Sequence, residues 1–276
     1  MIPRAHIIEW RAAGHPWRTD AMVEQDLLLG RVLVSLFADA EIRGQLVFRG
    51  GTALHKLFFA SPMRYSEDID FVQRESGRIG PVFSRVRELL EGWMGPPQRK
   101  QGPGVATMTF RLESEDLPPQ PLRVKVEINT REHFQVLPFQ AKPFAVSSRW
   151  FTGAAVLPVY DLNELLATKL RVLYQRRKGR DLFDLAAALR ALPVDPAIIV
   201  SVFERYMEVE SHRITRKAYR KNLAAKLGHP GFQSDCMPLL RPGIPFDLQA
   251  DQTLVDRLLL ARLSGDSEAV AADRLP

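Results

Sequence analysis

The chain has 276 residues, of which 46% are apolar and 25% are charged. This composition is typical of a globular protein, and the length suits one large domain or two of ordinary size. The single cysteine, Cys236, excludes an internal disulfide framework and any zinc site that depends on several thiolates. No apolar run approaches the roughly 20 residues that span a bilayer, and the first ten residues do not resemble a signal peptide. We therefore expect a cytoplasmic protein with no membrane partner.

The positive charge of the chain is unevenly distributed. The formal net charge is +6, with 38 basic and 32 acidic residues. The segment from Glu164 to Lys226 alone holds 14 Lys and Arg against 7 Asp and Glu, so it carries the whole excess. A basic half beside a neutral half is expected when one lobe binds an anionic substrate; the alternative is a set of solvated helix faces.

Hydrophobic periodicity predicts mixed structure in the first part of the chain and helices in the second. Helical spacing is found at 20–37, 52–59 and 81–94, with Asp20 as the cap of the first helix. Strand alternation is found at 46–48, 66–72, 105–112 and 122–129. Residues 150–158 are expected to be irregular, and the pattern is helical from Leu162 onward. This order predicts an α+β domain over residues 1–155 and a mainly helical domain over residues 156–276.

The most informative segment contains three polar side chains at strand spacing. Residues i and i+2 of a strand share a face, so Ser66, Asp68 and Asp70 should point the same way. Two neighbouring carboxylates repel each other unless a divalent cation lies between them, and oxygen ligands favour Mg²⁺ or Mn²⁺. Glu127 on the predicted strand 122–129 is a candidate third metal ligand if the two strands are adjacent. The alternatives are a solvated strand face at 66–70 and an exposed Lys125 and Glu127 face.

A glycine pair precedes this strand and predicts a phosphate-binding turn. Gly50, Gly51 and Thr52 join a strand to a helix, where glycine permits close approach and the helix N-terminus offers free N–H groups. The Thr52 hydroxyl would add one donor. Most such turns are only turns, but the spacing to Asp68 leaves room for one helix and a returning strand.

Charged residues at the start of the basic segment provide further candidates. Lys169 falls within an apolar helical stripe, where a buried ammonium requires an anion such as a triphosphate; the alternative is that its side chain reaches the surface. Gly179 suits the end of that helix and Asp181 the N-cap of the next. A basic cluster that either contacts RNA phosphates or forms a solvated turn consists of Arg176, Arg177, Lys178 and Arg180.

Taken together, these residues resemble a known family. Phe48-Arg-Gly-Gly-Thr-Ala-Leu and Arg64-Tyr-Ser-Glu-Asp-Ile-Asp-Phe are similar to the signature of DNA polymerase β-like nucleotidyltransferases. Glu164-Leu-Leu-Ala-Thr-Lys-Leu and Arg180-Asp-Leu-Phe-Asp-Leu resemble the AbiEii/MenT nucleotidyltransferase toxins of bacterial toxin–antitoxin systems. The resemblance implies a polymerase β-like N-terminal domain with a mixed sheet and a helical domain that completes the active site.

The resemblance also implies an activity. Such toxins use Mg²⁺ and a nucleoside triphosphate (NTP) to transfer a nucleotide to RNA, in some cases to the 3′ end of tRNA, which blocks translation and growth; a separate antitoxin protein is the expected partner. Gly50, Gly51 and Thr52 would match the phosphate-side turn. The motif residues with catalytic roles would be Asp68, Asp70, Lys169 and Asp181, with Lys169 also binding the triphosphate. Other hypotheses are a transferase acting on a small molecule and a non-catalytic interaction protein.

A regulatory site is also predicted. If the hydroxyl of Ser66 opens on the same cleft as Asp68 and Asp70, its phosphorylation would add about −1.5 to −2 charges beside the carboxylates. Such a group would capture the metal or repel the triphosphate. The alternative is that Ser66 makes only local hydrogen bonds.

Overall fold

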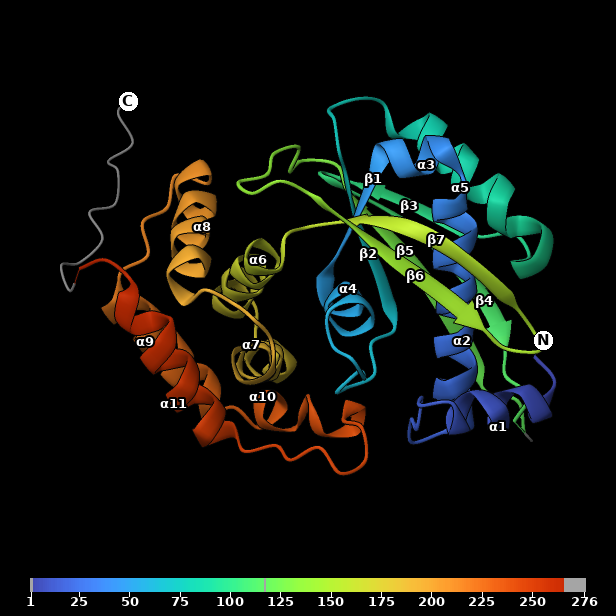
Figure 1. Ribbon diagram of the computed structural model, residues 1–276. Coiled ribbons are helices and arrows are strands. Elements are labelled where there is room, and N and C mark those ends of the chain that lie inside the picture. The colour runs from blue at the N-terminus through green and yellow to red at the C-terminus, as the bar shows by residue number, and fades with distance from the viewer. Residues whose placement is uncertain (1, 117, 266–276) are drawn as a thin grey trace. The chain divides into compact units, whose positions relative to one another are not determined.

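The computed structural model describes residues 2–116 and 118–265 (Figure 1). The chain forms two compact units. Of the described residues, the first unit contains those from 2 to 161 together with Leu239–Ile244, and the second contains Leu162–Pro238 and 245–265. The predicted boundary between 155 and 156 lies inside a strand, and the chain leaves the first unit only after that strand has ended.

A seven-stranded sheet forms the centre of the first unit, in the order β3-β4-β5-β2-β1-β7-β6. Its strands are β1 (Leu46–Arg49), β2 (Asp68–Gln73), β3 (Gln98–Gly102), β4 (Val105–Glu113), β5 (Pro121–Asn129), β6 (Gln140–Ser147) and β7 (Thr152–Val159). β1 is parallel to β7 and β2 is parallel to β5, whereas the other neighbours are antiparallel. The prediction of a mixed sheet is therefore confirmed.

Helices cover this sheet. They are α1 (Arg4–Ala12), α2 (Asp20–Ala38), α3 (Ala40–Gln45), α4 (Gly50–Leu57) and α5 (Ile79–Met94). The long helix α2 packs against β5, β6 and β7, and α4 packs against β1 and β2. Phe37 of α2 meets Phe71 of β2 edge-on at 5.4 Å between ring centroids. The buried aromatic contacts fix the central strands that carry the predicted site.

The N-cap of α2 differs from the prediction. Thr19 caps the helix, since its side chain accepts a hydrogen bond from the backbone N–H of Met22 at 3.2 Å. Asp20 is instead the first helical residue, and its carboxylate contacts the guanidinium of Arg11 at 2.5 Å. Thr and Asp are both good caps, so a one-residue shift between them is not resolved by composition.

The prediction that residues 150–158 are irregular was wrong. β6 and β7 form an antiparallel hairpin, in which Pro143 faces Val156 and Ala145 faces Ala154. These four residues are exposed although none of them is polar. The expected alternation of polar and apolar residues is therefore missing, and the hairpin gave no strand signal.

The second unit consists of helices. They are α6 (Leu162–Gln175), α7 (Gly179–Ala191), α8 (Pro196–Val209), α9 (Arg216–Leu227), α10 (Pro230–Ser234) and α11 (Leu248–Leu258), with the short 3₁₀ turn η2 (Leu260–Arg262). A second 3₁₀ turn, η1 (Met237–Leu239), lies where the chain returns to the first unit. α6 contacts α7, α8 and α9, and is the central helix of this unit. Among the described helices, none is long and apolar enough to cross a membrane.

Candidate active site

Asp68 and Asp70 lie at the start of β2. The strand alternates between partly exposed and buried positions there, and Ile69 and Phe71 point into the core. The two carboxylates therefore share the outer face, as predicted from their spacing. Ser66 differs from the prediction, because β2 begins at Asp68 and Ser66 precedes it.

β5 places two further charged residues beside these aspartates. In the parallel pairing of β2 with β5, Glu127 lies opposite Asp70 and Lys125 lies opposite Asp68. The Lys125 ammonium is 3.1 Å from a Glu127 carboxylate oxygen and 3.6 Å from an Asp68 carboxylate oxygen. The two strands are adjacent, as a metal-binding role for Glu127 requires, but the Glu127 carboxylate contacts Lys125.

Excess negative charge at this place changes the ionisation of its members. Burial, together with the charges of Asp68 and Glu127, raises the pKa of Asp70 to about 6, although Arg49 and Lys125 oppose the shift. Burial by itself would lower the pKa of Lys125, but the surrounding carboxylates outweigh it and the pKa is raised. The group therefore attracts a further cation.

The donor chemistry of Asp68 and Asp70 fits a hard divalent cation. Carboxylate oxygens are the ligands that Mg²⁺ and Mn²⁺ take, and such an ion would relieve the repulsion that raises the pKa of Asp70. Within residues 2–116 and 118–265, no group of three or more His, Cys, Asp or Glu side chains is arranged to hold a metal ion. The fit therefore concerns the aspartate pair rather than a three-carboxylate cluster.

The glycine pair brings the backbone against Asp70. β1 ends at Arg49 and α4 begins directly at Gly50, which has a φ of +81°. A Cβ atom at Gly50 would lie 2.3 Å from an Asp70 carboxylate oxygen, so no other residue fits there. Arg49, the N-cap residue of α4, makes no side-chain capping hydrogen bond. The first N–H groups of this helix are thus available to an anion, with a carboxylate of the aspartate pair beside them.

Thr52 has a different position from the one expected for a phosphate donor. It is buried, its hydroxyl donates to the backbone carbonyl of Asp68, and it lies 2.9 Å from Ser66 Oγ. These contacts tie α4 to the segment that leads into β2. In this structure Thr52 therefore positions Asp68 and Ser66.

In the second unit, Lys169 of α6 is buried in a network of charges. Its residue exposure is 4%, and its ammonium lies 2.5 Å from an Asp184 oxygen and 3.4 Å from an Asp181 oxygen. Arg176 holds the same Asp181 carboxylate through two hydrogen bonds of 2.7 and 2.9 Å. The lysine does not reach the surface, and the anions that compensate its burial belong to α7.

Asp181 is not the N-cap of α7, contrary to prediction. Lys178 occupies the N-cap position, Gly179 is the first helical residue, and Asp181 lies in the first turn. A Cβ at Gly179 would lie 2.1 Å from the backbone oxygen of Phe232, so this glycine serves close packing rather than ending α6. Burial would raise the pKa of Asp181, but Lys169 and Arg176 outweigh it and the pKa is lowered. Asp181 is thus an ionised partner for both cations.

The predicted RNA-binding cluster is partly engaged by acidic residues. Arg176 binds Asp181, as described. Lys178 and Arg180 lie 3.4 and 3.7 Å from the carboxylate of Asp235. Arg177 is exposed. The cluster therefore offers less uncompensated charge than its sequence indicates.

Asp184 and Arg49 were not singled out from the sequence, and Lys125 was named only as part of an exposed strand face. Asp184 lies three residues after Asp181, a spacing that puts both on one face of a helix, and this was a usable signal. Lys125 follows from the same alternation that identified Glu127. Arg49 lies opposite Asp70 in the β1–β2 pairing and binds Glu132 at 2.7 Å, which only the strand register reveals.

Comparisons with known proteins agree with this arrangement. The chain is similar to the structure of MenT4, a nucleotidyltransferase toxin from Mycobacterium tuberculosis H37Rv, with a TM-score of 0.73 and 23% identity over 96% of this chain and 92% of that one. It is also similar to JHP933 from Helicobacter pylori, with a TM-score of 0.54 and 16% identity over 88% and 91% of the two chains. A search of curated protein sequences found no significant match. These structural likenesses establish the fold.

The family assignment comes from a sequence profile. The profile described as "Nucleotidyl transferase AbiEii toxin, Type IV TA system" matches residues 31–257. This range contains both the β2 aspartates and the charge network of α6 and α7. The chain therefore belongs to the AbiEii/MenT family of nucleotidyltransferase toxins from toxin–antitoxin systems.

Proposed function

We propose that this protein transfers a nucleoside monophosphate from an NTP to RNA, at the 3′ end of a tRNA, and thereby blocks translation and growth. One observation carries the proposal: Asp68 and Asp70 share a strand face, and Gly50 brings an uncapped helix N-terminus against Asp70. A site for a cation and a site for an anion are then neighbours, which is what a metal–triphosphate substrate requires. A cognate antitoxin, as a separate chain in the cytoplasm, is the proposed partner.

In the reaction, the 3′-hydroxyl oxygen of the RNA forms a bond to the α-phosphorus of the NTP. The bond between that phosphorus and the pyrophosphate breaks, and the hydroxyl proton is released. When bound, Mg²⁺ lowers the pKa of the attacking hydroxyl and neutralises developing charge on the phosphate oxygens. The protein contributes mainly positioning and electrostatic stabilisation.

The proposed roles of individual residues follow from their positions. Asp68 and Asp70 hold the cation, and the N–H groups at Gly50 and Gly51 bind phosphate oxygens. Glu127 acts on the metal through its place opposite Asp70 or, with Lys125, sets the local charge. In the second unit, we propose from the family motif that Lys169 binds the triphosphate and that Asp181 orients it; to do so, Lys169 would exchange its internal contact with Asp184 for a phosphate oxygen.

The test is a transfer assay with a matched control. Purified protein is incubated with total RNA, Mg²⁺ and each labelled NTP in turn, and the labelled products are separated by size. We expect label in the tRNA fraction with one or more NTPs. Asp68→Asn should reduce transfer by roughly 10²–10³-fold, because it removes a charged ligand while keeping the shape of the side chain. Glu67→Gln is the control, since Glu67 is the exposed neighbour of Asp68.

Two outcomes would contradict the proposal. Full transfer by Asp68→Asn would mean that the β2 aspartates do not serve the reaction. Label found only in small molecules would mean that the acceptor is not RNA.

A further inference from the structure

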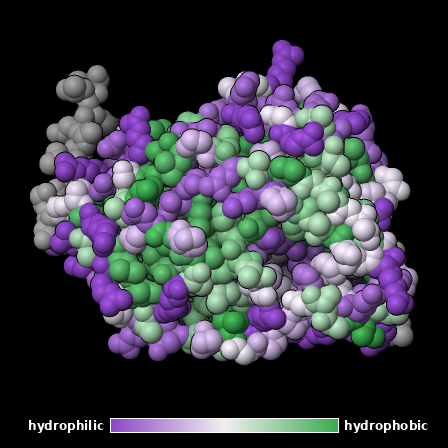
Figure 2. Space-filling view, viewed as in Figure 1, coloured by the Kyte–Doolittle hydropathy of each residue, from purple (hydrophilic) through white to green (hydrophobic). Residues whose placement is uncertain are grey.

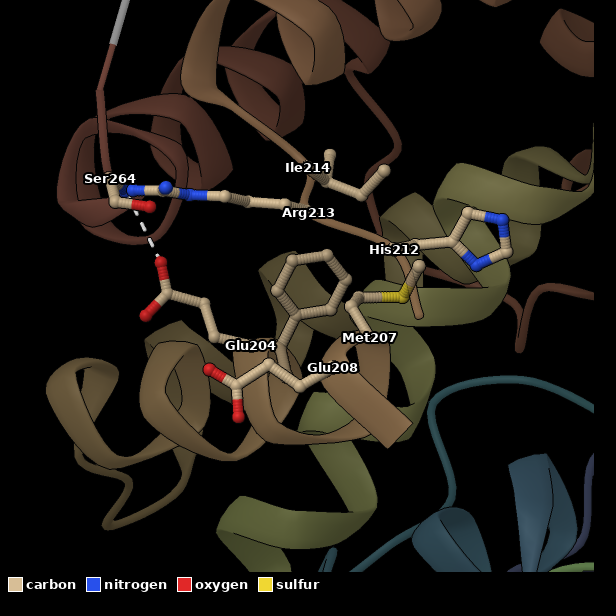
Figure 3. Close-up of a pocket in the computed structure, with 8 residues that line it drawn as sticks. Glu204, Met207, Glu208, His212, Arg213, Ile214 and Ser264 are labelled. Atoms are coloured by element: carbon tan, nitrogen blue, oxygen red, sulfur yellow. Dashed lines mark hydrogen bonds between the residues drawn. The ribbon is translucent and has the colours of Figure 1, made fainter. Parts of the chain in front are cut away.

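A pocket of about 260 Å³ lies in the second unit, and none of its lining residues belongs to the charge network of α6 and α7 (Figure 3). It is formed by the last turns of α8, the loop that leads to α9, and Ser264. Met207 and Ile214 give it apolar walls. Two carboxylates, Glu204 and Glu208, stand on its α8 side, and His212 and Arg213 belong to the loop. No role of the proposed reaction uses these residues.

The polar groups of this pocket are not equivalent. Glu204 accepts a hydrogen bond from the backbone N–H of Ser264 at 3.2 Å, so it holds the end of the pocket together. Glu208 is exposed, and the one ion pair it makes within the described residues is the solvated pair with Arg205 at 3.3 Å. It therefore keeps acceptor capacity for a ligand. A carboxylate between apolar walls suits the amino or imino N–H groups of a nucleobase, and guanidinium and imidazole groups offer planar surfaces for stacking.

Cations continue from the pocket along α9. Lys217 and Lys221 are exposed and lie four residues apart, on one face of the helix and about 6 Å apart along its axis. Arg213 precedes the same helix and is also exposed. Within the described part of the chain, no ion pair involves these three side chains. By contrast, Arg220, on a neighbouring face of α9, is bound to Asp256 at 2.7 Å.

Cations that have no ion pair among the described residues, beside a base-sized pocket, indicate a polyanion with bases. The cluster at 176–180 is largely engaged by Asp181 and Asp235, so it would have to give up these ion pairs to bind phosphates. Arg213, Lys217 and Lys221 have no ion pair of this kind to break within the described residues. Since phosphate contacts gain affinity by releasing counterions, unpaired cations are the ones that contribute.

We propose that Arg213, Lys217 and Lys221 contact the backbone of single-stranded RNA and that the pocket beside Arg213 takes one unstacked base. The inference extends the proposed function and rests on RNA being the acceptor. The ligand is RNA rather than a protein, because the pocket offers acceptors for the N–H groups of a base and the cations of α9 beside it suit phosphates.

The first experiment measures binding without catalysis. A fluorescently labelled 12-nucleotide RNA is titrated with the full chain in EDTA and without NTP, at several salt concentrations. The triple variant Arg213→Glu, Lys217→Glu, Lys221→Glu should bind at least about tenfold more weakly. Its slope of log K against log salt should be smaller by about 2, since each contact to a single strand contributes about 0.7. The matched control reverses Arg78, Arg99 and Lys100, three exposed cations of the first unit for which the described residues supply no ion pair, and it gives the same change in net charge.

The second experiment tests the pocket. An RNA with one 2-aminopurine should change its emission when that base enters the pocket. Ile214→Trp should abolish the change by filling the space, whereas Ile214→Val should keep it. An unchanged 2-aminopurine signal with wild-type protein would overturn the base-binding assignment.

These results are separable from those of the transfer assay. Equal losses of RNA affinity in the α9 variant and in its control would overturn the inference even if transfer to RNA occurs. RNA binding that depends on α9 in EDTA would support it even if no NTP is used.

Discussion

Lys169 and Asp184 form a buried pair whose stability and catalytic contributions can be separated. Lys169 is 4% exposed, the Asp184 side chain is fully buried, and their charged atoms are 2.5 Å apart. Removing one member of such a pair leaves a buried charge without this partner and costs about 3–5 kcal/mol of the free energy of unfolding. We therefore expect Lys169→Met and Asp184→Leu each to lower the melting temperature by roughly 6–20 °C.

The double variant should behave differently. When both charges are replaced by apolar side chains, the buried charge is no longer left behind, and buried pairs replaced in this way often lose little stability. We expect the double variant to recover most of the loss, with a coupling free energy of at least about 2 kcal/mol in the double-mutant cycle. Asp181 should stay ionised, because Arg176 still holds it.

The assay combines unfolding with activity. Urea unfolding followed by far-UV circular dichroism reports the helices. Tryptophan emission reports the first unit, since Trp10, Trp17, Trp93 and Trp150 all lie there. If Lys169 binds the triphosphate, the refolded double variant should not transfer nucleotides. Losses below about 1 kcal/mol in both single variants would refute the buried network, and full transfer by the double variant would refute the catalytic role of Lys169.

Three further predictions concern pH, regulation and RNA. The carboxylate of Asp26 is buried 2.6 Å from Lys56 and 3.0 Å from His15. Burial would raise the pKa of Asp26, but these two partners outweigh burial and the pKa is lowered. The ionised Asp26 therefore stabilises the fold fully above the unfolded pKa near 4, and this stabilisation is lost as the pH falls further. Wild-type protein should therefore lose more free energy of unfolding than Asp26→Asn between pH 5 and 3, and parallel pH curves would contradict this. Ser66→Asp should lose transfer in the labelled-NTP assay and Ser66→Ala should keep most of it, because Ser66 Oγ lies 2.9 Å from the Thr52 hydroxyl that positions Asp68; full transfer by Ser66→Asp would exclude gating at this residue. Charge reversal of Arg177 and Lys178 should weaken RNA binding more than NTP binding, measured by separate titrations, and an equal loss of both would remove this cluster from the RNA contact.

Whether an element could be predicted depended on whether its buried side is apolar and its exposed side is polar. Elements with one buried and one polar face, such as α5 and β5, were predicted to within a few residues. The β6–β7 hairpin was missed because its exposed positions hold Pro143, Ala145 and Val156 rather than polar residues. Figure 2 shows weakly hydrophobic residues on the surface in the region where Figure 1 places this hairpin. Sequence alternation fails where a solvent-facing strand lacks polar side chains.

The β2 aspartates and the Lys169 network differ in how far they could be predicted from the sequence. Asp68 and Asp70 are two residues apart on one strand, so their shared face and their repulsion follow from backbone geometry alone. A cation site at Asp68 and Asp70 could therefore be predicted without knowing which residues lie beside them in the fold. Lys169 also stood out, since an ammonium in an apolar stripe demands an anion, but α7 supplies that anion through Asp184 and Asp181. A substrate is the expected partner of a buried lysine only when the fold supplies no anion of its own, and here Asp184 and Asp181 are such anions. Among residues 2–116 and 118–265, the charge that lacks a full internal balance lies at the β2 aspartates and along α9, which makes these two places the better-supported positions for ligands of opposite sign.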